Sequence, residues 1–509
     1  MSLLNSLKST AQPVKSPPLS LEKLRTRIQE WAAGKKLRLQ SLFSDQSVNR
    51  MARDLGYDYR ERVFDPATTL GLFITQVLNR DEPCSTVVSR LNKERKDQGL
   101  PSVSANPSAY CYARNRIPVD LIETLIKKTV AVANVRVDKR WRWCDKDVLM
   151  VDGFTVRAPD TQANQSEFPQ PTSQEIGLGY PTLRVITLTS LATKVITCFQ
   201  YGPMDGKGNG ELSLFRKNFD SLRKNQVVVG DSIFDSYYDM AALLKRKVDG
   251  VFGIHATRDN PFIGQNLSRI RQTTRVLSRP KFDHNRISRE DWEKLPPTIT
   301  IRIIGFRTHG RCDQKVVVTT LLDRKKYPAR AIADLYGLRW EAELDIRCLK
   351  SVMDLAELRC QTPQGLKCEL AVNVLAYNLV ALLMCDTAEV SDKHPRQFSF
   401  SHARDTFVRF GAERKTINDL EWLITQTNQF KIKNRPRRDE PRKIKKRNGK
   451  YARLSEPRPS RKSRRSHEKV AQAPKLNAIR HKADGGQMSL VRHCGRESFS
   501  HAPQSSVGG

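Results

Sequence analysis

The chain has 509 residues, of which 39% are hydrophobic, so it is long enough for two or three domains with cores of their own. Its 88 Lys and Arg residues outnumber its 54 Asp and Glu residues, and the net charge is +34. Such a charge predicts attraction to polyanions, of which nucleic acid is the commonest, although a solvated basic surface or a ribosome-like tail is the simpler interpretation. The sequence contains no strongly amphipathic basic helix with Trp or Phe anchors, which argues against a membrane surface as the partner.

The cysteines and the apolar stretches predict an intracellular protein. The ten cysteines form no C-x-x-C pair and no Cys/His cluster with zinc spacing, which is typical of reduced thiols. The first residues, MSLLNSLKST, lack the apolar core of a signal sequence. The longest apolar stretch, Leu370–Met384, contains two Asn and is too short for a membrane span, so we interpret it as a buried helix. We therefore expect a soluble cytoplasmic protein with no membrane contact.

The first part of the chain predicts helices. Residues 1–19 carry the Pro-rich stretch PVKSPP and are expected to be disordered. Within residues 20–140, segments such as LEKLRTRIQEWAA and VDLIETLIKKTVAVA have apolar positions at helical spacing. Short helices separated by Arg and Lys suit a DNA-binding domain of helix-turn-helix type, but any small helical bundle has the same pattern.

The pattern changes to alternating strands and helices at residues 146–256. The segments DVLMVDGFTV, QVVVGD and GVFGIH are short, apolar and rich in β-branched residues, as buried strands are. The segments GELSLFRKNFDSL and YYDMAALLKRK have helical spacing. The order strand-strand-strand-helix-strand-helix-strand predicts an α/β layered domain.

The rest of the chain divides into four predicted segments. They are a β-rich insertion at 257–327 that contains TITIRIIGFRT and KVVVTTLL, a helical segment at 328–390 that completes the α/β domain, a helical C-terminal extension at 391–430, and a basic disordered tail at 431–509. Gly337 is expected to kink the helix in the second of these. In the tail, residues 431–465 hold 17 Lys and Arg against three acids, which is typical of a disordered polyanion-binding arm.

Three acidic residues are placed where chemistry is expected. Asp152 lies in the first apolar strand, Asp231 ends a later one, and Glu343 lies in the long helical segment. Each alone has a simpler interpretation, because an Asp at a strand end is often a turn or helix cap and helices are rich in Glu. Together they are oxygen ligands that suit Mg²⁺ or Mn²⁺. Two such ions about 4 Å apart activate water and stabilise the leaving oxygen of a phosphodiester.

The helix around Glu343 has an unusual polar stripe. At about 100° per residue, the side chains on this stripe are Tyr336, Arg339, Glu343, Arg347 and Lys350, beside an apolar stripe that runs from Leu335 to Met353. The stripe is either a salt-bridge ladder or a surface in which Glu343 binds metal while Tyr336, Arg339 and Lys350 bind phosphates. Spacing alone does not decide between these interpretations, and Arg347 is left without a role.

The spacing Tyr336-x2-Arg339-x3-Glu343-x6-Lys350 resembles the Y-R-E-K signature of one class of bacterial insertion-sequence transposases with an Asp-Asp-Glu active site. The segments LMVDGFTVRAPDT and VVVGDSIFDSYYDMAALLKR are similar to the regions of that family around its first and second Asp. The resemblance runs from about Phe64 to Leu382.

The resemblance implies a fold, a site and a reaction. It implies a ribonuclease-H-like catalytic core with a β-rich insertion before the helix of the catalytic Glu. Asp152, Asp231 and Glu343 would bind Mg²⁺, or Mn²⁺ in its place, and Tyr336, Arg339 and Lys350 would hold DNA. The reaction would be hydrolytic nicking at the terminal inverted repeat, then attack of the freed 3′ hydroxyl on another phosphodiester, in a cut-and-paste route through a hairpin at the transposon end.

The resemblance also implies partners, and it leaves alternatives. The DNA partners would be double-stranded, both the transposon ends and the target. The protein partner would be a second copy of the chain, in a homodimeric synaptic complex. The protein would be cytoplasmic and associated with the nucleoid. Trp292, in the insertion, would either stack on a flipped base or belong to the core. The alternatives to a transposase are a catalytically inactive DNA-binding derivative, a nuclease of the same fold without strand transfer, and a non-enzymatic RNA- or nucleoid-binding protein.

Overall fold

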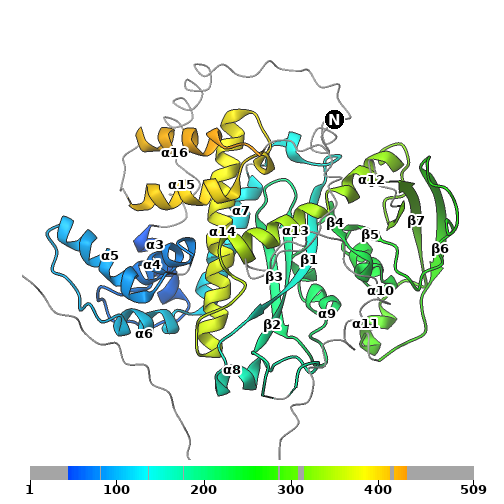
Figure 1. The fold of residues 1–509 in the computed structure, drawn as a ribbon. Helices are drawn as coiled ribbons and strands as arrows, with labels where there is room; N and C mark the ends of the chain where they lie inside the picture. The colour runs from blue at the N-terminus through cyan, green and yellow to red at the C-terminus, as the bar shows by residue number, and fades with distance from the viewer. Residues whose placement is uncertain are drawn as a thin grey trace, which may run out of the picture. The chain divides into compact units, whose positions relative to one another are not determined.

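An eight-stranded sheet forms the centre of the structure, with helices against both of its faces (Figure 1). The computed structural model describes residues 44–80, 82–135, 137–175, 177–284, 287–307, 314–412 and 418–432. The predictions of a disordered N-terminus at 1–19 and of a disordered basic tail concern residues outside these ranges, apart from the first two residues of the tail.

The predicted N-terminal helices are present in the described part of that region. They are α3 (Asp45–Asp54), α4 (Pro66–Leu78), α5 (Cys84–Asp97), α6 (Ser108–Arg116) and α7 (Val119–Val135). The start of α4 is fixed by Asp65, whose side chain accepts a hydrogen bond from the amide of Thr68 at 2.7 Å. The apolar faces of α4 and α7 share one core with the later helix α14, so these helices are not packed as a separate bundle. Their predicted role in DNA binding stays a prediction.

The central sheet is mixed. Its strands are β1 (Asp147–Arg157), β2 (Thr182–Ser190), β3 (Ile196–Pro203), β4 (Gln226–Gly230), β5 (Asp249–Gly253), β6 (Arg271–Ser278), β7 (Thr298–Arg307) and β8 (Gln314–Thr319), in the spatial order β3-β2-β1-β4-β5-β8-β7-β6. Strands β1, β2 and β3 are antiparallel neighbours, whereas β4 runs parallel to both β1 and β5. Helices α9 (Glu211–Arg216) and α10 (Tyr237–Lys245) connect the strands as predicted, and a short additional helix, α8 (Gln162–Glu167), follows β1. The predicted α/β fold is confirmed.

The predicted insertion extends this sheet. Strands β7 and β8 correspond to the two predicted strands, and β8 pairs with β5. Strand β6 is not among the predicted elements, because most of its side chains are exposed and its sequence RQTTRVLS lacks an apolar face. It lies at the edge of the sheet and pairs with β7 alone, so little burial is needed to hold it.

The helical segment after the insertion is broken twice. Helix α12 (Ala329–Gly337) ends at the predicted kink, α13 (Trp340–Arg347) follows after two residues, and a π-helical turn occupies Cys348–Val352. The predicted kink at Gly337 is present as the break between α12 and α13, whereas the π-turn was not predicted. The predicted apolar stripe is confirmed: its members are buried or, for one, partly buried, namely Leu335, Leu338, Ala342, Ile346, Leu349 and Met353.

The C-terminal helices are α14 (Pro363–Ser391), α15 (Phe400–Ala412) and α16 (Asn418–Gln429). Within the described ranges, α14 is the one helix long and apolar enough to cross a membrane by length and composition, and its apolar window is completely buried inside the fold. The interpretation of Leu370–Met384 as a buried core helix is confirmed. Figure 1 shows α14 running between the N-terminal helices and the sheet.

Candidate active site

The pairing of β1 with β4 brings two of the predicted acids together. The two strands are parallel, and Met150 pairs with Val229 at the end of the printed register. If this register is continued by two residues, Asp152 lies beside Asp231, the residue that follows β4. Adjacent strands lie about 4.8 Å apart, so the two carboxylates are side by side at the end of β4. Val148 and Met150 share the face of Asp152 and pack against α12 and α13, so Asp152 points to the layer that carries Glu343.

Asp152 lies in an environment that opposes its charge. Its pKa is raised to about 6, mainly by burial; the amide of Gly153 and the charge of Arg339 lower the pKa, and the charges of Asp231 and Glu343 raise it. One carboxylate oxygen accepts a hydrogen bond from that amide at 2.8 Å. Three acids therefore act on one another electrostatically in a half-buried space, an arrangement that a cation would relieve.

Asp231 caps a turn with one carboxylate oxygen and keeps the other available to a ligand. Its side chain accepts a hydrogen bond from the amide of Ile233 at 2.9 Å and so caps the 3-10 turn Ser232–Phe234. The simpler interpretation of Asp231, as a strand-end Asp that caps a turn, is thus confirmed. The cap uses one carboxylate oxygen; in the described part of the chain, the other oxygen accepts no hydrogen bond and is free to meet a ligand.

Glu343 forms the predicted ion pair with Arg339. The guanidinium of Arg339 donates to the Glu343 carboxylate at 2.8 Å, four residues away on the same helical face. Burial lowers the pKa of Arg339, but Tyr336, Glu343 and Asp152 outweigh this effect and raise it above its usual value. Arg339 therefore stays charged and lies within the field of the acids. The ladder interpretation is right for this pair in the ligand-free protein.

Tyr336 reaches the Asp231 side of the site. A Cβ atom placed on Gly253, the last residue of β5, would lie 2.6 Å from the Tyr336 hydroxyl and 3.3 Å from the backbone nitrogen of Ser232. Only a glycine leaves room for this ring beside the turn that follows Asp231. Burial raises the pKa of Tyr336, Arg339 lowers it, and Asp231 raises it again. Tyr336 therefore stays protonated near neutral pH and can donate a hydrogen bond.

The acids suit a metal by chemistry but do not form a closed cage. Within the described residues, no group of three His, Cys, Asp or Glu side chains is arranged to hold a metal ion. The carboxylate of Glu343 is paired with Arg339 instead. The oxygen-donor set and the charge repulsion on Asp152 fit a hard divalent cation. Glu343 would complete the set once its carboxylate leaves Arg339.

Two further residues of the predicted stripe lie at the end of α13 and in the turn after it. Lys350 is half-buried in the π-helical turn, and Arg347 is exposed at the end of α13. Single π-turns are rare and are frequent at functional sites. Sequence reasoning missed a fourth acid, Glu211 on α9, which lies over Gly153 on the opposite face of β1. Burial raises the pKa of Glu211, Arg184 lowers it, and Asp231 raises it.

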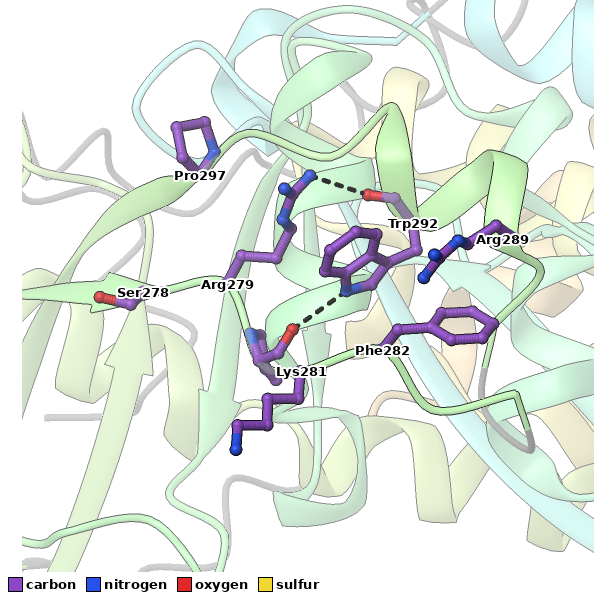
Figure 2. A pocket seen from close by; sticks show the side chains of 8 residues that line it. Ser278, Arg279, Lys281, Phe282, Arg289, Trp292 and Pro297 are labelled. Carbon is purple, nitrogen blue, oxygen red and sulfur yellow. Dashed lines mark hydrogen bonds between the residues drawn. The ribbon is translucent and has the colours of Figure 1, made fainter.

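Trp292 lines a pocket in the insertion. It lies on the short helix α11 (Arg289–Glu293) and is partly buried against the core. Its indole nitrogen donates to the carbonyl of Pro280 at 3.0 Å, and the guanidinium of Arg279 lies 3.9 Å from its ring centroid (Figure 2). The pocket has a volume of about 480 Å³ and is lined by cationic and aromatic side chains, including Arg289 and Phe282. Its use for a base stays a prediction.

Known proteins resemble this chain over most of its length. Residues 143–379 match the transposase DDE domain family. The transposase InsG for insertion sequence element IS4 of Escherichia coli (strain K12) is 27% identical over 390 residues, which cover 74% of this chain and 84% of that protein. The transposase for insertion sequence element IS421 of Escherichia coli is 38% identical over 65 residues, 13% of this chain and 18% of that protein. A cryo-EM structure of the piggyBac transposase synaptic complex with hairpin DNA has 9% sequence identity and a TM-score of 0.38, over 83% of this chain and 84% of that one.

The matched region contains β1, β4 and α13, and therefore all three predicted acids. The sheet, the paired strand ends and the family match define a DNA transposase, an enzyme that cleaves DNA and transfers its strands. Within that class, residues 143–379 match the DDE type and the chain is similar to insertion-sequence transposases, as the Y-R-E-K spacing predicted.

Proposed function

We propose that Asp152, Asp231 and Glu343 bind the divalent metal of this transposase, with Mg²⁺ as the natural ion and Mn²⁺ as a substitute. The observation that carries the proposal is the β1–β4 register, in which Asp152 and Asp231 are neighbours below the helix of Glu343. The raised pKa of Asp152 supports it, because a cation would remove the repulsion among the three acids. When bound, such an ion activates water and stabilises the leaving oxygen of a phosphodiester.

The proposed reaction takes place at the terminal inverted repeats of the element. Water attacks the phosphodiester at the repeat boundary and leaves a 3′ hydroxyl, which then attacks a second phosphodiester in a cut-and-paste route. The half-buried position of Asp152 limits water around the reacting phosphate, which strengthens the electrostatic interactions there. Tyr336 stays protonated and therefore donates, rather than repels, at a phosphate oxygen.

Arg339 has two partners in the proposed reaction. In the ligand-free protein its guanidinium neutralises Glu343. If Glu343 held a metal, the same guanidinium would be available to a DNA phosphate, which it can bind through two N–H groups. Metal and DNA would then support each other's binding. Tyr336 and Lys350 are proposed to bind the backbone of the same strand.

The wider assignments follow from this function. We propose that β1 to β5, in the order β3-β2-β1-β4-β5, form a ribonuclease-H-like core, and that β6, β7 and β8 are its insertion. The helices within residues 20–140 and the basic tail at 431–509 are proposed to bind DNA, because the net charge of +34 favours a polyanion. The active assembly is proposed to be a homodimer that holds two transposon ends in the bacterial cytoplasm, at the nucleoid.

A cleavage and joining assay tests the proposed function. The full-length protein is mixed with Mg²⁺ and a duplex that carries the inverted repeat flanking its gene, together with a supercoiled target plasmid. We expect nicking at the repeat boundary and joining of the freed 3′ end to the plasmid, and we expect neither in EDTA. The variant Glu343→Gln should lose both activities. The matched control Glu357→Gln, on an exposed carboxylate outside the site, should retain them.

The other outcomes separate the alternatives. Binding of the repeat with no cleavage in Mg²⁺ or Mn²⁺ would identify an inactive DNA-binding derivative. Nicking without joining would identify a nuclease. Cleavage that persists in Glu343→Gln would show that the acid on α13 is not part of the catalytic set.

A further inference from the structure

Helix α13 carries a second charged cluster, on the side away from Glu343. Asp345 follows Glu343 by two residues, which is a rotation of about 200° around the helix. Its side chain is almost completely buried and faces the interior, where it meets Arg396 and Lys194. Burial raises the pKa of Asp345, but these two cations outweigh the effect and hold it below its usual value. The cluster is therefore a charged network in the core.

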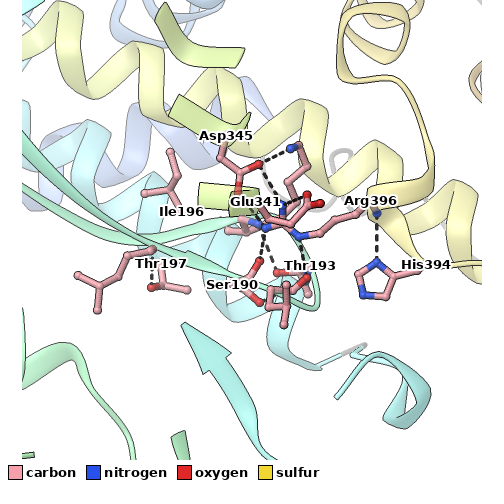
Figure 3. Close-up of polar contacts among 12 residues, drawn as sticks. Ser190, Thr193, Ile196, Thr197, Glu341, Asp345, His394 and Arg396 are labelled. Carbon is pink, nitrogen blue, oxygen red and sulfur yellow. Dashed lines mark hydrogen bonds and ion pairs between the residues drawn. The ribbon is translucent and has the colours of Figure 1, made fainter. Parts of the chain in front are cut away.

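Arg396 is the centre of this network, and every nitrogen of its guanidinium donates. It donates to the two carboxylate oxygens of Asp345 at 2.8 and 3.1 Å and to Glu341 at 3.2 Å (Figure 3). It also donates to the backbone carbonyls of Leu191 at 2.9 Å and Ser190 at 3.0 Å. A lysine has one nitrogen with three hydrogens and cannot form this set.

The network joins three segments that are distant in sequence. Asp345 and Glu341 belong to α13. Ser190 ends β2, and Leu191 and Lys194 lie in the turn between β2 and β3. Arg396 lies in the 3-10 turn Pro395–Gln397 between α14 and α15. Lys194 has a φ of +65°, a conformation that favours glycine. A lysine at this position is explained by its ammonium group, which pairs with Asp345. Arg396 lies beyond the matched transposase domain at 143–379.

Helix α13 needs such an anchor because it is short and interrupted. It has eight residues, no side-chain cap at its start, a break before it and a π-turn after it. Its apolar contact with the sheet includes Ala342, a side chain too small to define a rotation. Buried ion pairs add little stability compared with apolar residues of the same volume, but their directional hydrogen bonds define orientation.

We propose that Arg396 is a positioning residue, which fixes the rotation of α13 and thereby holds Glu343 toward Asp152 and Asp231. The inference rests on the proposed metal-binding role of Glu343. It assigns to the segment after the transposase domain a direct part in shaping the active site. Loss of the guanidinium fork should weaken metal binding while DNA binding and folding are kept.

The test measures Mn²⁺ binding by electron paramagnetic resonance of the free ion, with the full-length protein bound to a precleaved transposon-end duplex. Arg396→Lys should raise the Mn²⁺ dissociation constant about tenfold and the Mg²⁺ concentration for half-maximal nicking by a similar factor, with unchanged affinity for the duplex. The matched control is Arg302→Lys, which alters another fully buried arginine that donates to side-chain and backbone oxygens, in the insertion. It should lower the melting temperature without changing Mn²⁺ binding.

Two further variants keep the inference open to refutation. If Arg396→Lys does not fold, Glu341→Gln removes the outer partner of the guanidinium and should shift Mn²⁺ binding about threefold in the same direction. Unchanged Mn²⁺ binding in a folded Arg396→Lys, or in Glu341→Gln, would overturn the positioning role. Glu343→Gln distinguishes the two proposals: if it leaves Mn²⁺ binding unchanged, the metal role of Glu343 fails and the positioning role fails with it. If it abolishes binding and Arg396→Lys does not weaken it, only the positioning role fails.

Discussion

The half-buried charge of Asp152 destabilises the folded protein at neutral pH when no metal is bound. Its pKa is about 6 in the folded protein and 3.8 in its ordinary state. Between these values the folded state keeps a proton that the unfolded state has lost, so stability falls as pH rises through this window. Above about pH 6 the full cost is present, up to about 3 kcal/mol. The charge of Asp152 therefore lowers the free energy of unfolding, and a bound metal ion would offset this loss.

We therefore expect Asp152→Asn to stabilise the metal-free protein. The free energy of unfolding should rise by about 1–3 kcal/mol at pH 8, and the gain should shrink at pH 4.5, where the wild-type carboxyl is protonated in the fold. Urea denaturation in EDTA at both pH values measures this difference. The control Asp58→Asn, on an exposed side chain, should change stability at neither pH. A gain that is the same at both pH values would contradict the account.

Gly253 and Tyr336 provide a second test at the residue scale. The variant Gly253→Ala places a methyl group against the Tyr336 hydroxyl, and overpacking of this kind costs roughly 1–3 kcal/mol. In the Tyr336→Phe background the hydroxyl is absent, so the same substitution should cost less than half as much. Equal costs in the two backgrounds, measured by urea denaturation, would show that the ring does not occupy this position.

At this scale the sequence predicted the chemistry of the site but not its packing. Asp152 and Asp231 were identifiable because the first lies in an apolar strand and the second follows one, and the Arg339–Glu343 pair was identifiable from its spacing of four. The contact of Tyr336 with Gly253 was not, because it depends on where β5 lies relative to α12. The partners of Arg396 were not predictable either, since they come from two segments that are distant from it in sequence.

At the scale of elements, the helical segment that carries Glu343 was predicted in its faces and in its break at Gly337, but not in its π-turn. The apolar stripe was predictable because period 3.6 survives short interruptions. The π-turn at Cys348–Val352 has no signal in composition, because it depends on one extra residue accommodated by tertiary contacts. Edge strand β6 was missed because a strand exposed on both sides has no apolar alternation.

The two cations on either side of Glu343 allow a prediction for this helix. Arg339→Ala and Lys350→Ala should each weaken binding of a transposon-end duplex about tenfold, which is about 1.4 kcal/mol, because each removes a proposed phosphate contact. Fluorescence anisotropy in Mg²⁺, with a precleaved duplex that cannot be nicked, measures this affinity. The matched control is Arg347→Ala, an exposed arginine of the same helix with no assigned role.

Measurements of metal affinity in the same variants distinguish a role in phosphate binding from a role in metal binding. Arg339→Ala removes the ion pair of Glu343, so its Mn²⁺ affinity should be unchanged or higher. A collapse of Mn²⁺ affinity in Arg339→Ala or Lys350→Ala would show that these residues support the metal rather than the phosphates.

At the scale of the whole molecule, basic residues are in excess both in the tail and in the rest of the chain, while one apolar core joins segments that are distant in sequence. The net charge is +34, and residues 431–465 contribute 17 basic and three acidic side chains, so the rest of the chain is still strongly basic. The core joins the N-terminal helices to α14 and the sheet. Domain boundaries drawn from composition could not reveal this sharing, because a helix packed on a distant helix has the same pattern as one packed in its own bundle.

The tail gives a prediction at this scale. A chain that ends at Ile432 should bind DNA with a smaller slope of log affinity against log salt, because fewer counterions are released from the phosphates. A chain that ends at Arg465 keeps the basic stretch and should retain the full slope. Equal slopes in the two truncated chains would show that residues 433–465 do not contact DNA.

The central claim is that three carboxylates from β1, the end of β4 and α13 act as one catalytic unit. Single-turnover nicking of a transposon-end duplex in Mg²⁺, by Asp152→Asn, Asp231→Asn, Glu343→Gln and their pairwise combinations, tests it most directly. Each single variant should lose roughly 10³-fold or more in rate, and the double variants should lose little more, because residues that act as a unit are not additive. Near wild-type nicking by any one of the three single variants would contradict the claim.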